Sequence, residues 1–174
     1  MPLTSYLKSA LHQFQFYKNL GEQSLLQVSD EQLFFQPNEE SNSISIIVQH
    51  LWGNMMSRWT NFLTEDGEKI WRQRDSEFEP QITTRESLME KWNEGWQCVF
   101  KALNSVSDTD MDRIIYIRDE ANTLMEAINR QVAHYAYHVG QIVFLAKWMK
   151  NEDWSSLSIP RNKSIEYNQR KMKA

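Results

Sequence analysis

Cysteine, glycine and proline are scarce in this sequence of 174 residues, which contains one Cys, five Gly and four Pro. With Cys98 as its one cysteine, the chain cannot form an internal disulfide and gives no sign of an oxidising compartment. The small number of glycines and prolines disfavours a β-sandwich or β-barrel, because such folds need many turns.

Long apolar runs are also missing. No window approaches the roughly eighteen uninterrupted apolar residues that a membrane-spanning helix requires. The N-terminal stretch MPLTSYLKSALHQF has no basic segment followed by an apolar segment, so it does not read as a signal peptide. We therefore expect a cytoplasmic protein with no membrane partner.

The net charge of −4 is unevenly distributed. The segment 161–174 holds five Lys or Arg against one Glu, so it carries +4 and residues 1–160 carry −8. An acidic body argues against a nucleic-acid footprint. A basic tail could touch nucleic acid, but we interpret it as a solvated terminus and expect no nucleic-acid partner.

Apolar residues recur at helical spacing in four long stretches. These stretches run from about Ser5 to Gln27, from Ile44 to Leu63, from Thr83 or Thr84 to about Asn104, and from Asn122 or Thr123 to about Lys150. Three pairs have the spacing of a capping box, namely Ser29 with Gln32, Thr83 with Glu86, and Thr123 with Glu126. The sequence predicts an all-α fold, with residues 1–160 as a single four-helix-bundle domain and residues 161–174 as a basic C-terminal tail.

Three connecting segments need separate interpretation. Residues 70–82, IWRQRDSEFEPQI, mix charges and aromatics without a period, and we predict an ordered loop that covers something. Residues 113–118 include a β-like run, but no partner strand is evident, so we predict an extended connector. Trp154 and Ile159 are expected to fold the C-terminal segment back onto the bundle.

Gly21 could bend the first helix or end it early.

The motif HYAYH places His134 and His138 four residues apart, on one face of a helix. Neutral imidazoles at this spacing suit Zn²⁺, Ni²⁺ or Fe²⁺. The spacing alone is common, and a structural role stays open. His50, on the inward edge of the second long helix, would supply a third nitrogen and leave coordination positions open. Tyr135 stands where a zincin has its glutamate, which excludes that protease mechanism.

The residues around these histidines resemble the DinB-like (DinB/YfiT) superfamily. The stretch NRQVAHYAYHVGQIVFLAK is similar to its last bundle helix, and SRWTNFLTEDGEK followed by RDSEF resembles a branch described as a domain of unknown function. The resemblance implies a four-helix bundle of the DinB/YfiT type and a divalent metal held by His50, His134 and His138. It also implies relatives that transfer bacillithiol-like thiols to electrophiles, or that use mycothiol to isomerise a substrate.

We therefore predict a divalent-metal-dependent enzyme that transfers a low-molecular-weight thiol to a small electrophile. The alternatives are a metal-dependent hydrolase and a non-catalytic, stress-related bundle protein. No carboxylate lies one helical turn from the three histidines, which favours thiolate chemistry over hydrolysis, although a base could come from the 70–82 loop. A homodimer is a further hypothesis, because bundles with large aromatic faces often pair.

Several other side chains are candidates at such a site. Asn54 and Gln141 could orient a ligand of the metal, or pack only. Arg58, Arg72 and Arg74 could clamp an anionic small-molecule substrate, or form an ion-pair network that pins the loop. Tyr137 could donate a proton, or pack at the helix edge. His12 and Cys98 are expected to lie outside the site, the latter as a buried, unreactive thiol.

Overall fold

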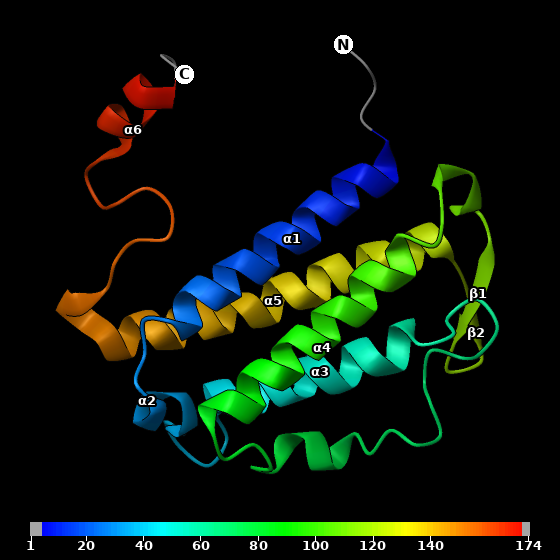
Figure 1. Cartoon of the computed structure of the whole chain (residues 1–174), viewed down its shortest axis with the longest axis horizontal. Helices are drawn as coiled ribbons and strands as arrows, with labels where there is room; N and C mark the ends of the chain where they lie inside the picture. The colour runs from blue at the N-terminus through cyan, green and yellow to red at the C-terminus, as the bar shows by residue number, and fades with distance from the viewer. Residues whose placement is uncertain (1–4, 172–174) are drawn as a thin grey trace.

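The computed structural model describes residues 5–171, so the first four residues of the stretch searched for a signal peptide and the last three of the basic tail lie outside it. Four long helices dominate these residues (Figure 1). They are α1 (Tyr6–Leu25), α3 (Ile44–Trp59), α4 (Arg85–Leu103) and α5 (Leu124–Lys150). The prediction of an all-α four-helix bundle is confirmed.

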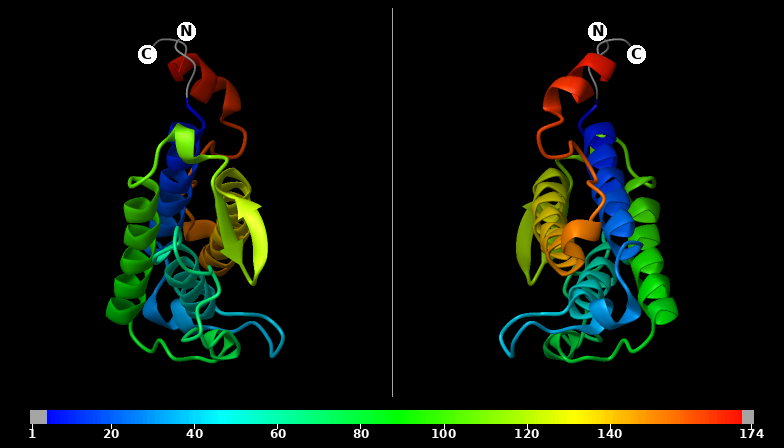
Figure 2. Two further views of the ribbon diagram at one scale, coloured as in Figure 1. Left: turned by 90° about the vertical axis from the view of Figure 1, so that its right-hand side faces the viewer. Right: turned by 90° about the vertical axis from the view of Figure 1, so that its left-hand side faces the viewer.

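Shorter elements connect and flank the long helices. They are α2 (Asp30–Phe34), η1 (Asp75–Phe78), η2 (Asp108–Asp110), η3 (Asn151–Asp153), α6 (Ser164–Lys171) and two strands, β1 (Ile114–Ile117) and β2 (Glu120–Thr123). No helix among residues 5–171 is long and apolar enough to cross a membrane. In Figures 1 and 2, α6 lies away from the four long helices.

Side-chain caps set the starts of the helices. Ser29 with Gln32 and Thr123 with Glu126 form the predicted capping boxes. The box predicted from Thr83 is wrong, because Thr84 is the N-cap of α4 and its hydroxyl accepts a hydrogen bond from the backbone N–H of Ser87. Residues 83 and 84 are both threonines. Thr84 is the cap, because its backbone is extended and it directly precedes Arg85, the first residue of the helix.

Helices α1 and α3 both end before the predicted residue, α1 at Leu25 and not at Gln27, and α3 at Trp59 and not at Leu63. Helix α3 ends at Trp59, because Thr60 has an extended backbone and Asn61 has a φ of 48°. Phe62 is nevertheless buried, so the apolar pattern continues past the end of the helix. Hydrophobic periodicity indicates which residues are buried, and after α3 the chain stays partly buried although its backbone is no longer helical.

Residues 114–123 form an antiparallel hairpin, which corrects the prediction of an unpartnered connector. Ile114 pairs with Thr123 and Ile117 with Glu120. Arg118 and Asp119 both have positive φ, as a two-residue hairpin turn requires, and their backbone N–H groups donate to the Asp66 carboxylate. The second strand, EANT, is composed mostly of residues with low β-propensity, so it could not be recognised from its composition.

The core lies between two helix pairs, with α3 against α4 and α1 against α5 (Figure 2). Phe14, Trp96 and Tyr135 are fully buried at its centre and contact one another with ring centroids 5.5–6.3 Å apart. The Tyr135 hydroxyl accepts a hydrogen bond of 3.0 Å from the indole N–H of Trp59. Tyr135, the first of the three residues between the two histidines of HYAYH, therefore belongs to the core.

The C-terminal segment only partly follows the prediction. Trp154 is half-buried and packs against the core, and Gln27 holds the backbone of Ser155 through hydrogen bonds of 2.8 and 3.1 Å. Ile159 is 41% exposed, so its predicted packing on the bundle is wrong. The contacts with the turn after α1 thus reach Ser155, and the segment is largely exposed from there to Ile159.

Gly21 neither bends nor ends α1, which continues to Leu25. A Cβ atom at this position would lie 2.4 Å from Cη2 of Trp92, a side chain that is 2% exposed. Glycine is therefore needed here for the close approach of α1 to the Trp92 ring.

We expect Gly21→Ala to lower the free energy of unfolding by about 1–3 kcal/mol, because the added methyl group overpacks against Trp92. Gly140→Ala is the matched control, since a Cβ there meets no atom within 4 Å. That variant should be more stable by up to about 1 kcal/mol through helix propensity. Urea denaturation measures both, and equal changes in the two variants would contradict the explanation.

Candidate metal centre

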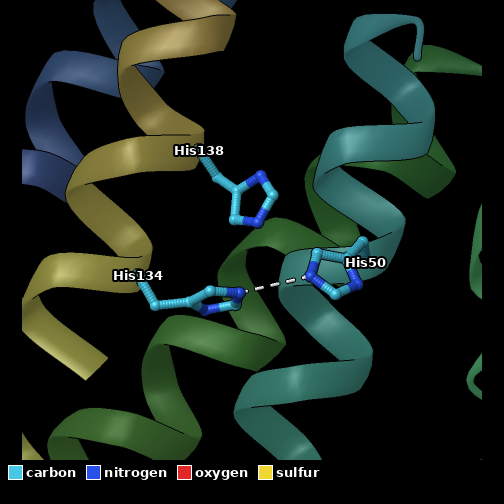
Figure 3. A group of neighbouring side chains, drawn as sticks. All are labelled: His50, His134 and His138. Atoms are coloured by element: carbon cyan, nitrogen blue, oxygen red, sulfur yellow. Dashed lines mark hydrogen bonds between the residues drawn. The ribbon is translucent and has the colours of Figure 1, made fainter. Parts of the chain in front are cut away.

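Three histidines from two helices converge in the middle of the bundle (Figure 3). His50 comes from α3, and His134 and His138 come from successive turns of α5. One ring nitrogen from each lies within 4.8 Å of the others, and Nε2 of His50 lies 3.3 Å from Nε2 of His134. Two nitrogens bound to one tetrahedral zinc ion lie about 3.3 Å apart. The three histidines could therefore hold a metal ion.

Burial keeps the two histidines of α5 unprotonated. Burial, together with the neighbouring histidines, lowers the pKa of His134 to about 3. Burial and His50 also lower the pKa of His138 to about 4, although its hydrogen bond with Gln141 opposes the shift. Both imidazoles are neutral near pH 7, which is the form that binds a metal.

Hydrogen bonds on the outer nitrogens orient two of the rings. Nδ1 of His50 lies 2.9 Å from a carboxylate oxygen of Glu77, and Nδ1 of His138 lies 2.9 Å from the amide oxygen of Gln141. A carboxylate or amide oxygen accepts from Nδ1–H, which leaves Nε2 with a free lone pair. Nδ1 of His134 is buried and has no hydrogen-bond partner among residues 5–171.

The Glu77 side chain is itself buried and held on two sides. Arg72 donates to its two oxygens at 2.7 and 2.9 Å. Burial alone would raise the pKa of Glu77, but the hydrogen bonds from His50 and Arg72 hold it below its ordinary value. Gly53 of α3 makes room for this carboxylate, because a Cβ there would lie 2.3 Å from Oε1 of Glu77.

The segment 70–82 is ordered and covers the histidine cluster, as expected. The Phe78 ring stacks on the His50 ring, with centroids 4.9 Å apart and planes 27° apart. The amide of Gln49 donates to backbone carbonyls of Ser76, Glu77 and Glu79 and so fixes the segment to α3. Glu77 was missed as a partner of His50, because 27 residues separate them and no local spacing connects them.

A cavity of about 190 Å³ opens beside His50 and His134. Four predicted site residues line it, namely Asn54, Arg58, Arg72 and Arg74. Three more that the sequence did not single out also line it, namely Arg118, Arg130 and Gln131. These three come from the hairpin turn and the first half of α5, which only the fold brings next to α3.

Other candidates lie elsewhere. Tyr137 is 64% exposed, although its ring contacts the ring of His138 with centroids 4.9 Å apart. His12 is exposed on α1, away from the cluster. Cys98 is half-buried, and burial raises its pKa above the ordinary value, which agrees with an unreactive thiol.

The sequence matches the model of a family described as "Protein of unknown function (DUF1572)" over residues 3–163. The chain belongs to this family. Its fold is similar to that of a DinB-like protein from Bacillus cereus ATCC 10987, with a TM-score of 0.61 and 15% identity over 80% of this chain and 90% of that one. At this identity the similarity shows the fold alone, and this fold is the one that the DinB-like resemblance implied. No curated protein matches the sequence.

The stability of the metal-free protein should fall as the pH drops below 6.5. The pKa values of His134 and His138 in the folded chain, about 3 and about 4, lie below their ordinary value of 6.5. The unfolded chain therefore takes up protons first, and stability present above pH 6.5 is lost progressively toward pH 4.

The free energy of unfolding, measured by urea denaturation in the presence of a chelator from pH 7 to pH 4, checks this dependence. A variant with both His134→Gln and His138→Gln is the comparison, because it lacks the two titrating groups. Its stability should fall less steeply over the same range. Identical slopes would show that the loss comes from other groups.

Proposed function

We propose that this DUF1572 protein is a divalent-metal-dependent enzyme whose metal ligands are His50, His134 and His138. One observation carries the proposal: one ring nitrogen from each of the three histidines, which come from two helices, lies within 4.8 Å of the others. Sites on helices hold ligands more firmly than sites on loops. A set of three imidazoles suits Zn²⁺, Ni²⁺ or Fe²⁺, and leaves positions for a substrate.

The reaction that we propose is transfer of a low-molecular-weight thiol to a small electrophile. A divalent metal at such a site would lower the pKa of a thiol that binds to it. In the transfer, the sulfur forms a bond with the electrophilic carbon, the leaving group departs with its electron pair, and the thiol proton is released. This proposal accounts for neutral ligands and for a substrate cavity beside them.

The acid–base groups favour thiol transfer over hydrolysis. Within residues 5–171, no Asp or Glu lines the cavity next to the histidines. The nearest carboxylate, Glu77, has both oxygens engaged by His50 and Arg72. A hydrolase would need a free base for water, whereas a thiolate needs none. We assign Glu77 the role of a positioning residue that holds the proton of His50 at Nδ1.

Gln141 acts in the same way at the other end of the cluster. Its amide oxygen accepts from Nδ1–H of His138 and turns Nε2 of that ring toward the other two histidines. Arg72 fixes Glu77, and through it the ring of His50. Phe78 stacks on that ring, and His50 is 4% exposed. These residues together orient the ligands before any substrate arrives.

The purified protein should contain one divalent metal ion per chain by elemental analysis. Replacing His50, His134 or His138 singly with Ala should lower metal affinity by more than 100-fold, since loss of an outer partner alone costs about 10–100-fold. His12→Ala is the matched control and should bind metal normally. Full binding by the His50→Ala variant would overturn the assignment of the ligands.

The same preparations test the reaction. With a panel of low-molecular-weight thiols and a simple electrophile, the metal-loaded protein should consume thiol and electrophile one for one, and the three alanine variants should not. Turnover of an ester or amide without any thiol would instead establish the hydrolase. Metal binding without turnover of either kind would leave the protein a non-catalytic metal-binding bundle and overturn the proposal.

Gly53→Ala should weaken metal binding although Gly53 ligates nothing. The added methyl group would occupy the space of the Glu77 carboxylate and push it away from His50. We expect metal affinity, measured by competition with a chelator, to fall by about 10–100-fold. Gly140→Ala adds the same methyl group on α5 without a neighbour and should leave the affinity unchanged. Equal affinities of the two variants would remove Glu77 from the site.

A further inference from the structure

We propose that the cavity beside His134 binds the oxyanionic group, a carboxylate or a phosphoryl group, of a small-molecule substrate. The inference rests on the proposed function, because the same substrate would reach the metal centre. Three independent features of the described residues support it, namely the charge of the lining, the unpaired polar atoms and the volume.

The lining is strongly basic. Five arginines contribute to it, and they come from α3, the 70–82 loop, the hairpin turn and α5. They are Arg58, Arg72, Arg74, Arg118 and Arg130.

In the part of the chain that the structure describes, two carboxylates compensate this charge. Glu68 pairs with Arg58 and Arg118 at 3.0 Å each and with Arg72 at 3.6 Å, and Glu77 pairs with Arg72 at 2.7 Å. Within residues 5–171, Arg74 and Arg130 form no ion pair. Concentrating five like charges around one cavity costs free energy, which an anionic ligand would offset.

Buried polar atoms without a partner gather at the same place. Residues 5–171 contain seven such side-chain atoms, and five of them belong to residues that line the cavity. They are Arg58 Nε, Arg72 Nη1, Asn54 Oδ1, Gln131 Oε1 and His134 Nδ1.

The two guanidinium nitrogens that have no hydrogen-bond partner among residues 5–171 are well buried, and one of them, Arg72 Nη1, lies 3.6 Å from a carboxylate oxygen of Glu68. Arg58 is 6% exposed, and the side chain of Arg72 is 2% exposed. An unpaired buried donor costs about 1–3 kcal/mol, so native proteins keep few of them. A cluster of these atoms at a basic cavity points to a ligand that completes their hydrogen bonds.

The unpaired oxygens define the ligand further. Asn54 Oδ1 and Gln131 Oε1 accept hydrogen bonds and donate none. Besides the contacts of its oxyanion with the arginines, a ligand with a neighbouring hydroxyl would donate to one of these oxygens, and one with a neighbouring amino group could donate to both. We therefore expect a 2-hydroxy or 2-amino acid group, or a phosphate ester with a neighbouring hydroxyl.

The volume limits the size of the ligand. At about 30 Å³ for each water molecule, a cavity of about 190 Å³ has room for about six. A carboxylate or phosphoryl group with two or three further atoms fits this space. A nucleotide or a peptide does not fit, so the bulk of a larger substrate would lie outside the cavity.

Isothermal titration of the metal-free protein with inorganic phosphate, glycolate and acetate tests the proposal. One oxyanion should bind per chain, and the arms with phosphate and with glycolate identify which oxyanion is preferred. Glycolate should bind more tightly than acetate, because only glycolate carries a hydroxyl that can donate to one of the two amide oxygens. Absence of saturable binding of phosphate and of glycolate would overturn the proposal.

The variant Arg74→Gln/Arg130→Gln removes the two arginines that form no ion pair, both of which are exposed. Its affinity for the preferred anion should be at least about 10-fold lower, because charge-assisted hydrogen bonds are lost. Arg113→Gln is the matched control, since this exposed arginine lies outside the cavity lining. Equal loss in both variants would show a non-specific effect of net charge and overturn the site.

His138→Ala separates this proposal from the proposed function. His138 does not line the cavity, so this variant should lose the metal and keep the anion affinity. The double arginine variant should show the opposite result, with normal metal binding and weak anion binding. Anion binding that requires the metal and ignores the arginines would mean that the anion binds the metal alone, which would overturn the arginine site.

Discussion

The rest of the site depends on the hydrogen bonds that the buried carboxylate of Glu77 accepts. This carboxylate accepts hydrogen bonds from His50 on one side and from Arg72 on the other, in a space that Gly53 leaves open. A buried charge is stable only while it is paired, so displacing either partner would leave it uncompensated. This requirement fixes the 70–82 segment on α3 and orients a candidate metal ligand at the same time.

The same segment explains why the arginines gather where they do. Arg72 and Arg74 lie beside the candidate metal centre because Glu77 and Phe78 anchor the segment over His50. Asp66 holds the hairpin turn through backbone hydrogen bonds, which brings Arg118 to the same cavity. The basic cavity and the histidine cluster are therefore two results of one arrangement of loops around α3.

Residue patterns predicted the four long helices of the fold and the three histidines of the candidate site. Helical periodicity located the four long helices, and the caps at Ser29 and Thr123 set the starts of two elements. The histidine pair of α5 followed from its spacing, and His50 from its inward edge. The hairpin was missed because EANT is a poor strand by composition, and tertiary anchoring at Asp66 overrides that preference.

By itself, the sequence determined what depends on neighbours within one or two helical turns, namely the helices, their caps and the pairing of His134 with His138. The tertiary structure alone decided that Glu77 bonds His50 across 27 residues, and that Arg118 and Arg130 line a cavity next to them. Such contacts depend on how separate segments pack. Contacts of this kind leave no periodic pattern in the sequence, because the two residues are far apart along the chain and meet only in the folded protein.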